Sequence, residues 1–564
     1  MTEQKPQAAS RAEAIAQLTA TGEAFELGSA EQYGRTVRAF VTGPQTLGAL
    51  FEQARSDATF FVYGDERLTF EQAFARAARV AHALRERCNV APGDRVAISM
   101  RNYPEWPLAF MATTSIGAVA VAMNALWQGD EMVYALKDSG AKVLIADGER
   151  LARFAPVADQ LPDLRVVGTR LGDQPLPSDA WAFDALIDES ATAGMPAVAV
   201  APNDDATMFY TSGSTGHPKG AVSTHRNVLS ALMSWELDAQ AAARVSGVAP
   251  PELPYQPATL LAVPLFHVTG SHAVYLASYR GQRKIVSMHK WDPEEAAQLI
   301  EREQISSFIA PAAMTGDLVV ASERTRCDLS TLLAVGGGGA PRAPEQVRDI
   351  DRAFAAAMPG TGWGMTETNG IGTGIGGPDY LERPSSSGRV SAVLDIKVVD
   401  EAGQTLPAGE RGELLIRGAS VIRGYWNRDD ANAETFDDDW LKTGDVAYID
   451  DEGFLFIVDR IKDLVIRGGE NIGCGEVEAA LLEHPAILEA CVYGVPDERL
   501  GEEVGASYFA DTALSEAALR DFLGARLARF KVPRYLTASP EPLPRTASGK
   551  ILKRALRDAA AGAD

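Results

Sequence analysis

Helical and strand-like segments alternate along most of the chain, and this alternation limits the fold more than any other feature. Residues 68–87 (LTFEQAFARAARVAHALRER) carry apolar side chains at helical spacing, while RVAISM at 95–100 and KVLIAD at 142–147 are short β-rich runs. Strands that are separated by helices pair as parallel sheets, which helices must cover on both faces. The sequence therefore predicts an α/β fold for the first part of the chain.

The pattern of the chain changes twice after this region. From about Ser385, short strands such as DIKVVD and GELLIRG are separated by Gly and Pro, which is typical of antiparallel β structure. After Asp459, the last stretch of roughly 100 residues is long enough for a small α+β domain. We therefore expect a large N-terminal domain of parallel-rich sheets with helices plus a small β subdomain over residues 1–458, and an α+β C-terminal domain over residues 459–564.

Composition excludes several classes of partner. The 564-residue chain has a net charge of −23 and no run of Lys and Arg, so neither nucleic acid nor an anionic membrane is an expected partner. The N-terminus lacks the features of a signal peptide, and no segment reaches the ~18 to 20 apolar residues of a membrane span. The most apolar segment, 110–127, is expected to form a buried helix and strand. The chain as a whole has four cysteines, which are scattered along the sequence and fit a reducing, cytoplasmic setting.

The stretch YTSGSTGHPKG, residues 210–220, contains almost nothing that could fill a hydrophobic core. Its small residues let backbone N–H groups converge on phosphate oxygens, its Ser and Thr side chains add hydroxyl donors, and Lys219 adds a charge. It differs from the G-x-x-x-x-G-K-[ST] nucleotide loop, because Gly220 follows Lys219. The alternative is a flexible loop between the strand ATMFY and a helix starting near His225.

Motifs spread along the chain together resemble the adenylate-forming superfamily, which contains acyl-CoA synthetases, luciferases and the adenylation domains of peptide synthetases. The resemblance extends from about Leu47 to Arg554. It implies that a carboxylate attacks ATP to give an acyl-adenylate and pyrophosphate, and that a thiol then captures the acyl group. After YTSGSTGHPKG, the motifs are LFHVTG (265–270), VGGGGAP (335–341), GWGMTET (362–368), TGD (443–445), DRIKDLVIRGGENI (459–472) and PRTASGK (544–550).

The resemblance assigns catalysis to Lys550, Glu367 and His267. Lys550 would stabilise charge that develops in the first step, and Glu367 with Thr211 would hold Mg²⁺. Taken singly, each residue has a plainer alternative: a solvated tail lysine, a helix-start carboxylate or a core histidine. In the nucleotide site that the family implies, Trp363 would stack on the purine, and Asp445 and Arg460 would form hydrogen bonds with the ribose hydroxyls. The residues of this site are Thr211, Ser212, Gly213, Ser214, Thr215, Gly216, Lys219, Gly339, Ala340, Pro341, Trp363, Gly364, Met365, Thr366, Asp445 and Arg460.

The same resemblance implies an acyl pocket and a mobile C-terminal domain. Phe266–His267 stands where peptide-synthetase domains place an Asp for the substrate ammonium, which favours an uncharged fatty or aromatic acid. Asp459 would be the hinge between the two steps. The expected ligands are a small carboxylic acid, ATP, Mg²⁺ and coenzyme A. The residues expected to line the acyl pocket are His267, Gly270, Ser271, Gly336, Gly337, Gly338 and Trp363. The residues expected to face coenzyme A are Gly468, Gly469 and Glu470.

Two departures from the family pattern limit this interpretation. Trp363 stands where many relatives have Tyr, and Gly473–Cys474–Gly475 replaces a Tyr-Pro or Ser-Pro pair. Cys474 has no cationic neighbour and is expected to be a packing residue. The acyl group could also pass to a carrier-protein thiol, and the fold alone excludes neither a non-catalytic nucleotide-binding protein nor a luciferase-type oxidation. The sequence does not identify the carboxylic acid. It is compatible with a homodimer but does not fix the oligomeric state.

Overall fold

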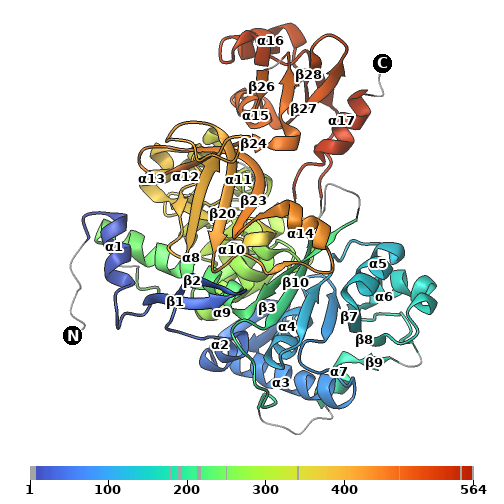
Figure 1. Ribbon diagram of the computed structural model, residues 1–564. Coiled ribbons are helices and arrows are strands. Elements are labelled where there is room, and N and C mark those ends of the chain that lie inside the picture. Colours follow the sequence, from blue (N-terminus) through green and yellow to red (C-terminus); the bar gives the residue numbers. More distant parts are fainter. Residues whose placement is uncertain are drawn as a thin grey trace.

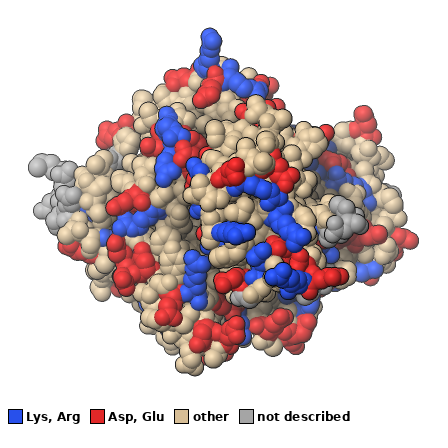
Figure 2. Space-filling model, turned by 90° about the horizontal axis from the view of Figure 1, so that it is seen from above, with Lys and Arg blue, Asp and Glu red and all other residues tan. Residues whose placement is uncertain are grey.

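The computed structural model describes residues 8–177, 180–188, 194–211, 217–248, 251–339, 342–468, 470–546 and 549–561. The chain forms a large domain with two mixed sheets, an antiparallel β subdomain and a small C-terminal domain, which lies at the top of the molecule in Figure 1. Figure 2 shows acidic and basic side chains intermixed on the surface seen from above. This architecture confirms the fold class that the sequence predicts.

The first large sheet contains the strands predicted at 95–100 and 142–147, which are β5 and β7. Its centre is parallel, and an antiparallel hairpin of β10 and β11 lies beside it. Strand β11 corrects one expectation, because the glycine-rich stretch runs into this strand rather than directly into the helix at His225. In spatial order the strands are β21 (Gly424–Tyr425), β11 (Lys219–Thr224), β10 (Asp205–Thr211), β6 (Val119–Ala122), β5 (Arg95–Ser99), β7 (Ala141–Asp147), β8 (Arg165–Thr169) and β9 (Trp181–Ala182).

The second large sheet is parallel in its centre and ends in antiparallel strands on both sides. Its parallel strands end at the same edge, so the loops that follow β12, β14, β15 and β16 gather there. In spatial order the strands are β18 (Arg389–Val390), β17 (Thr373–Gly376), β16 (Met358–Thr361), β15 (Ala334–Gly337), β14 (Ser307–Ala310), β12 (Ala258–Leu261), β13 (Lys284–Ser287), β3 (Thr59–Tyr63) and β4 (Glu66–Thr69).

Helices fill the space between the two sheets and cover their outer faces. The segment 110–127 forms buried α4 and β6, as predicted, and no helix in the described parts of the chain is long and apolar enough to cross a membrane. α3 and α4 pack in the main core with residues of both sheets, while α5 and α6 cover the other face of the first sheet. The helices are α2 (Leu47–Gln53), α3 (Phe70–Glu86), α4 (Glu105–Ser115), α5 (Gly129–Ser139), α6 (Gly148–Phe154), α7 (Phe183–Asp188), α8 (His225–Ser246), the π-helical η2 (Thr269–Leu276), α9 (Ala277–Arg280), α10 (Pro293–Glu303), α11 (Ala312–Thr325), α12 (Pro344–Ala353) and α13 (Gly377–Glu382).

The antiparallel β subdomain lies where the sequence predicts it. β24 pairs with β23 in an antiparallel register that extends to Arg460 opposite Asp445. The predicted domain boundary, between residues 458 and 459, therefore falls near the end of β24. The helix α14 (Asp429–Thr435) precedes β22. The strands are β19 (Leu394–Val399), β20 (Gly412–Gly418), β23 (Trp440–Ile449), β22 (Phe436–Asp437) and β24 (Leu455–Arg460).

The C-terminal domain packs two helices and a sheet around its own core, with a third helix near the C-terminus. The helix α16 ends at Gly524, where the chain turns, and Arg520 holds the returning segment through the carbonyl of Pro533. The elements are β25 (Val465–Arg467), β26 (Glu470–Ile472), α15 (Cys474–Leu482), β27 (Ile487–Asp497), β28 (Gly501–Ala510), α16 (Glu516–Gly524), β29 (Tyr535–Ser539) and α17 (Lys553–Ala561).

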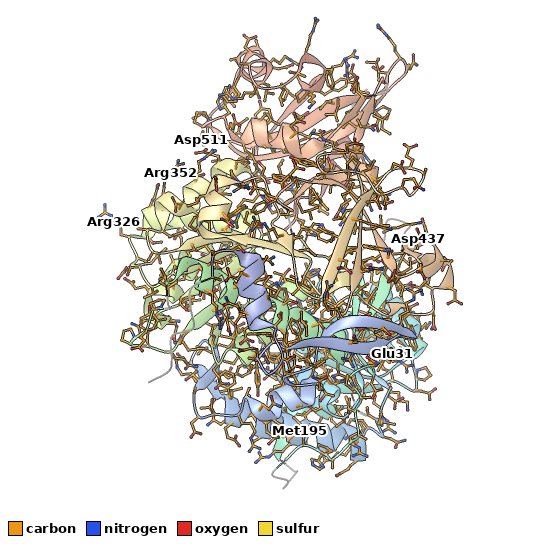
Figure 3. The ribbon with its side chains drawn as sticks, turned by 60° about the vertical axis from the view of Figure 1, so that its left-hand side comes forward. Glu31, Met195, Arg326, Arg352, Asp437 and Asp511 are labelled. Carbon is orange, nitrogen blue, oxygen red and sulfur yellow. The ribbon has the colours of Figure 1, made fainter. Side chains whose placement is uncertain are left out.

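An N-terminal arm packs across the large domain. It consists of α1 (Arg11–Leu18) and a hairpin of β1 (Leu27–Gln32) and β2 (Arg35–Phe40), whose tip is marked by Glu31 in Figure 3. Arg38 pairs with Asp395 of the β subdomain at 2.9 Å, and Arg11 pairs with Asp238 of α8 at 2.6 Å. The arm therefore ties the β subdomain to α8.

Candidate active site

A cavity of about 2350 Å³ has walls from both the large domain and the C-terminal domain. Most of the predicted site residues line it, although they are far apart in the sequence. Its large-domain wall uses the loops at the carboxyl edge of the second sheet, where α/β folds commonly bind ligands. The predicted residues that line it are Thr211, Lys219, His267, Gly336, Gly337, Gly338, Gly339, Trp363, Gly364, Met365, Thr366, Glu367, Asp445, Asp459, Arg460 and Lys550.

Some predicted residues are not part of this wall. Gly270 is a close-packing position, since a Cβ there would lie 2.1 Å from the carbonyl oxygen of Pro264. Ser271 is fully buried and donates to the carbonyl of His267 at 3.0 Å. Neither residue lines the cavity, so the structure does not support their predicted place in the acyl pocket. Ser212, Gly213, Ser214, Thr215, Gly216, Ala340, Pro341 and Gly469 lie outside the described residues.

The β10–β11 hairpin brings the two ends of the glycine-rich stretch together at the cavity. Thr211 lies opposite Lys219 in the hairpin, and the Lys219 ammonium lies 5.0 Å from the ring centroid of Tyr425. Gly220 leaves no room for a side chain, because a Cβ would come within 2.8 Å of Met208 Sδ. A hydroxyl and a cation thus flank the hairpin tip, as a site for phosphate oxygens requires.

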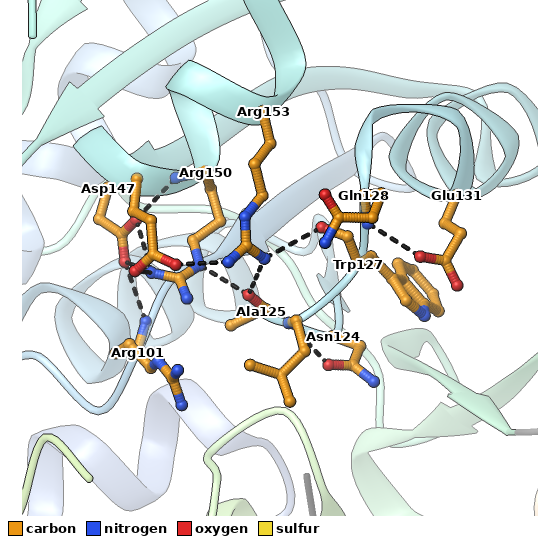
Figure 4. A network of polar contacts seen from close by, with 11 residues as sticks. Arg101, Asn124, Ala125, Trp127, Gln128, Glu131, Asp147, Arg150 and Arg153 are labelled. Atoms are coloured by element: carbon orange, nitrogen blue, oxygen red, sulfur yellow. Dashed lines mark hydrogen bonds and ion pairs between the residues drawn. The ribbon is translucent and has the colours of Figure 1, made fainter. Parts of the chain in front are cut away.

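A network of arginines holds the neighbouring loop of the cavity wall (Figure 4). Arg150, buried on α6, pairs with Asp147 at 3.0 Å and donates from Nε to the carbonyl of Ala125 at 2.7 Å. Arg153 donates to the same carbonyl at 3.2 Å. Two residues after Ala125, Trp127 lines the cavity and packs edge-on against Tyr210, with ring centroids 5.7 Å apart. The network therefore fixes a wall beside the hairpin.

Glu367, which the family resemblance assigns to Mg²⁺ binding, lies in the cavity wall. Its side chain is only 7% exposed, and its Oε1 accepts a hydrogen bond of 2.6 Å from the hydroxyl of Tyr425. Thr211 lines the same cavity, and no cluster of three or more His, Cys, Asp or Glu that could hold a metal exists in the described parts of the chain. One carboxylate and one hydroxyl fit Mg²⁺, which keeps most of its water and binds substrate phosphates.

The predicted ribose site is built around Asp445, which is only 4% exposed. Its Oδ2 accepts a hydrogen bond of 2.7 Å from the indole N–H of Trp363, and its Oδ1 pairs with Arg460 at 3.1 Å. Burial raises the pKa of the Asp445 carboxyl, while Arg460 and Trp363 act in the opposite direction. The two donors orient an acceptor-only group toward a ligand with hydroxyl donors.

Lys550 reaches into this site from the C-terminal domain. Its Cε lies 3.7 Å from where a Cβ on Gly339 would be, so the lysine stem passes directly over the glycine loop. Burial lowers the pKa of Lys550, as does the nearby Arg460, while Asp445 and Glu367 favour the charged form. The ammonium is therefore close to the carboxylates that would surround the nucleotide and metal.

His267 lines the cavity at the start of η2, beside Phe266 with ring centroids 4.9 Å apart. Burial lowers its pKa to about 4, and the nearby Lys550 acts in the same direction. The imidazole is therefore neutral at physiological pH and can offer either a donor or an acceptor to a ligand, but no charge.

Asp459 connects the last strand of the β subdomain to the C-terminal domain. Its Oδ2 accepts a hydrogen bond of 2.5 Å from the backbone N–H of Cys474, the first residue of α15. Cys474 is fully buried in the C-terminal core, and burial raises the pKa of its thiol, which confirms its role as a packing residue. Gly468 and Glu470, predicted on the CoA side, lie on the β25–β26 hairpin and do not line the cavity.

Several residues of the site lie outside the motifs that the sequence offers. Tyr425 holds Glu367, and the GYW triplet that carries it, between a strand and a helix, was an available signal. Arg342 is buried in the wall and donates to Thr315 at 3.0 Å. Trp235 of α8 also lines the cavity, but its helical spacing among apolar residues gave no sign of this.

Comparisons with known proteins agree with this geometry. Residues 50–426 match the family described as AMP-binding enzyme, and residues 476–550 match the AMP-binding enzyme C-terminal domain. The chain is 35% identical over 88% of its length to the long-chain-fatty-acid–CoA ligase FadD13 of Mycobacterium tuberculosis (strain ATCC 25618 / H37Rv), covering 93% of that protein. It is 34% identical over 89% of its length to feruloyl-CoA synthase of an Amycolatopsis species, covering 95% of it.

A solved structure shows the same fold with an intermediate bound. o-Succinylbenzoate-CoA synthetase (MenE) from Bacillus subtilis, in complex with the acyl-adenylate intermediate OSB-AMP, superposes with a TM-score of 0.75 at 29% identity. The match covers 91% of this chain and 98% of that one. Together with the two family matches, these relatives show that the chain belongs to the AMP-binding enzyme family, in its branch of adenylate-forming acid–CoA ligases.

Proposed function

We propose that this protein activates a fatty or aromatic carboxylic acid with ATP and transfers the acyl group to coenzyme A, releasing pyrophosphate and AMP. The observation that carries the proposal is the position of Lys550, which reaches from the C-terminal domain into a cavity that also holds Glu367, Asp445 and His267. The relatives named as fatty-acid and feruloyl CoA ligases support the reaction class and the range of acids.

In the first step, a carboxylate oxygen of the acid attacks the α-phosphorus of ATP, and the bond to the bridging oxygen of pyrophosphate breaks. Thr211 and Lys219 flank the phosphates at the hairpin tip, while Asp445, held by Trp363 and Arg460, accepts the ribose hydroxyls. Lys550 neutralises charge on the reacting oxygens. Mg²⁺, which Glu367 and Thr211 would hold, supplies further charge neutralisation at the phosphates.

In the second step, the CoA thiolate attacks the acyl carbonyl, and AMP leaves. Gly468 and Glu470 lie outside the cavity in the structure, so the proposal requires the C-terminal domain, residues 459–564, to move relative to residues 1–458. Asp459 supports a hinge role, because it lies at the end of β24 and binds the first amide of α15. Its backbone would absorb the rotation.

A panel of acids assayed for AMP release, with and without CoA, tests the proposed function. Acid-dependent release that requires CoA is the expected result. Adenylate formation with no CoA requirement for any acid would contradict transfer to CoA and favour a carrier-protein thiol as acceptor. No acid-dependent ATP–pyrophosphate exchange at all would favour a non-catalytic nucleotide-binding role.

The cellular location and the oligomeric state are also part of the proposal. All four cysteines are free thiols, which supports the proposed cytoplasmic location, because reducing compartments keep thiols unpaired. We also propose a homodimer, which light scattering of the purified protein would test against a monomer.

A further inference from the structure

The cavity continues beyond His267 along one face of two helical segments. Thr269, Ala273 and Ala277 line it at successive turns of η2 and α9, and Trp235, Ala239 and Ala242 line it from α8. The segment from Thr269 to Ala277 spans roughly 12 Å, at about 1.5 Å per helical residue. Mostly small side chains therefore border a channel that leads away from the reacting carboxylate.

Arg283, the third residue after α9, lines the same cavity. Among the described residues, no hydrogen-bond or ion-pair partner lies within reach of its guanidinium. Arg283 is half-buried, and this partial burial lowers the pKa of its guanidinium. A half-buried cation without a partner offers its N–H donors to an anionic group of a ligand that enters the cavity.

The acids near Arg283 are already paired with other cations. Glu236 of α8 pairs with Arg280 at 2.5 Å, and Asp238, two residues further along the helix, pairs with Arg11 of the N-terminal arm at 2.6 Å. Glu236 is the only acid that acts on Arg283 electrostatically in the described structure, and Arg280 holds it. Among the described residues, Arg11 and Arg280 thus hold the two nearby acids, and Arg283 is left without an acidic partner.

We propose that Arg283 binds a second anionic group of the acid substrate, so that the preferred substrates are dicarboxylic acids whose distal carboxylate lies at this end of the channel. The inference rests on the proposed function and narrows it, because the sequence favoured an uncharged acyl group. The planar guanidinium suits a carboxylate, which it binds through two parallel hydrogen bonds.

A structural role for Arg283 makes a different prediction. Its Nε lies 3.3 Å from where a Cβ on Gly281 would be, close to the carboxyl end of α9, where a cation is favoured by the helix dipole. If that were its whole role, replacing it would lower stability and would reduce activity equally with every acid. Selectivity between charged and uncharged chain ends is therefore the decisive measurement.

The test compares matched acids in ATP–pyrophosphate exchange with the full-length enzyme. Adipic, suberic, sebacic and dodecanedioic acids are assayed beside their mono-methyl esters, which keep the length but remove the distal charge, and beside the matching monocarboxylic acids. The variants are Arg283→Gln and Arg283→Lys, with Arg302→Gln as control because that arginine is exposed on α10. Thermal unfolding of each variant confirms that it folds.

We expect at least one diacid to exceed its mono-ester in kcat/KM by roughly ten- to hundredfold, the range for a charge-assisted pair. In Arg283→Gln, kcat/KM for the diacid should fall to that for its mono-ester, while kcat/KM for the mono-ester stays unchanged. Arg283→Lys should keep part of the preference for the diacid. Equal activity of wild-type enzyme on diacids and mono-esters overturns the inference and leaves the acid–CoA ligase function intact. Absence of exchange with every acid overturns both.

Discussion

The indole N–H of Trp363 donates a 2.7 Å hydrogen bond to the carboxylate of Asp445, 82 residues further along the chain. Gly372 makes room for the indole, because a Cβ there would lie 2.5 Å from the ring. The indole of this tryptophan therefore supplies the donor that holds the Asp445 carboxylate. The residue predicted to stack on the purine thus also orients the group predicted to bind the ribose.

Trp363→Phe keeps an aromatic face but removes the donor to Asp445. We expect the KM for ATP to rise by about tenfold, because a hydrogen bond to a charged group is worth about 1.5–3 kcal/mol and part of this remains through Arg460. The preference for ATP over 2′-deoxy- and 3′-deoxy-ATP should shrink, while the KM for the acid stays unchanged. Steady-state kinetics of pyrophosphate exchange with the three nucleotides measure this.

Trp291→Phe is the matched control, because Trp291 makes an equivalent bond of 2.9 Å to Asp317 and does not line the cavity. That variant should leave the nucleotide preference unchanged. If Trp363→Phe lowers activity with all three nucleotides equally, its hydrogen bond serves packing alone.

Lys550→Ala removes the only C-terminal residue for which a catalytic role is proposed. Adenylation should fall by roughly two to three orders of magnitude, the cost of losing one contact to developing charge. Thioester formation from supplied acyl-adenylate and CoA should persist, since that step does not need this charge. Arg554→Ala, on the exposed side of α17, should leave both reactions unchanged. Full exchange activity in Lys550→Ala would remove the lysine from the mechanism.

The sequence predicted many of the elements, and most of its candidate site residues line the cavity, but it did not predict the contacts between them. Helical periodicity and β-rich runs located α3, β5 and β7, because burial of one or both faces leaves a regular pattern. Gly270 and Ser271, whose place in the acyl pocket stays a prediction, do not line the cavity, because proximity in sequence to His267 does not fix which way a π-helical turn faces.

The remaining contacts join residues that are remote in sequence, so no local pattern records them. Tyr425 and Glu367 meet across 58 positions, and Asp445 meets Trp363 across 82. In the sequence, Arg283 looks like any surface arginine, because only the folded surroundings leave it without a partner among the described residues. Family motifs recover residues that recur, whereas such chain-specific contacts require the structure.

Tyr425→Phe tests the support of the proposed metal carboxylate. Without the 2.6 Å hydrogen bond to Glu367, we expect the Mg²⁺ concentration for half-maximal adenylation to rise by about tenfold, because the carboxylate loses a charge-assisted donor. Titration of exchange activity with Mg²⁺ measures this. Tyr493→Phe, which loses a 2.8 Å bond to Ser507 in the C-terminal domain, is the control. An unchanged Mg²⁺ requirement in Tyr425→Phe would separate Tyr425 from the metal.

Arg150→Met tests the network beside the hairpin. Asp147 and Arg150 are both nearly fully buried, so removing the cation leaves a buried carboxylate uncompensated, at a cost of about 3–5 kcal/mol. The double variant Asp147→Asn/Arg150→Met should recover part of this loss, and Arg302→Met on the surface should cost little. Denaturant unfolding of the variants provides the measurement, and a loss below about 1 kcal/mol in Arg150→Met would show the pair behaving like a surface ion pair.

His225 should make the protein less stable as the pH falls. Its Nδ1 accepts a hydrogen bond of 3.1 Å from the backbone N–H of Leu47, and burial lowers its pKa to about 4. An unfolded histidine binds its proton near pH 6.5, whereas the folded one resists protonation until about pH 4. The stabilisation is therefore complete above pH 6.5 and is lost as the pH falls toward 4, by about 3 kcal/mol at most.

The variant His225→Asn separates this titration from the other acid-sensitive groups. The amide oxygen can still accept from Leu47 but does not titrate, so the fall in Tm between pH 7 and pH 4.5 should be smaller than in the wild type. His82→Asn, on α3, should leave the fall unchanged. His267 and His272 have pKa values lowered to about 4 by the same burial, so part of the pH dependence should remain in His225→Asn. A fall in Tm equal to that of the wild type would mean that the Leu47 contact does not depend on a neutral imidazole.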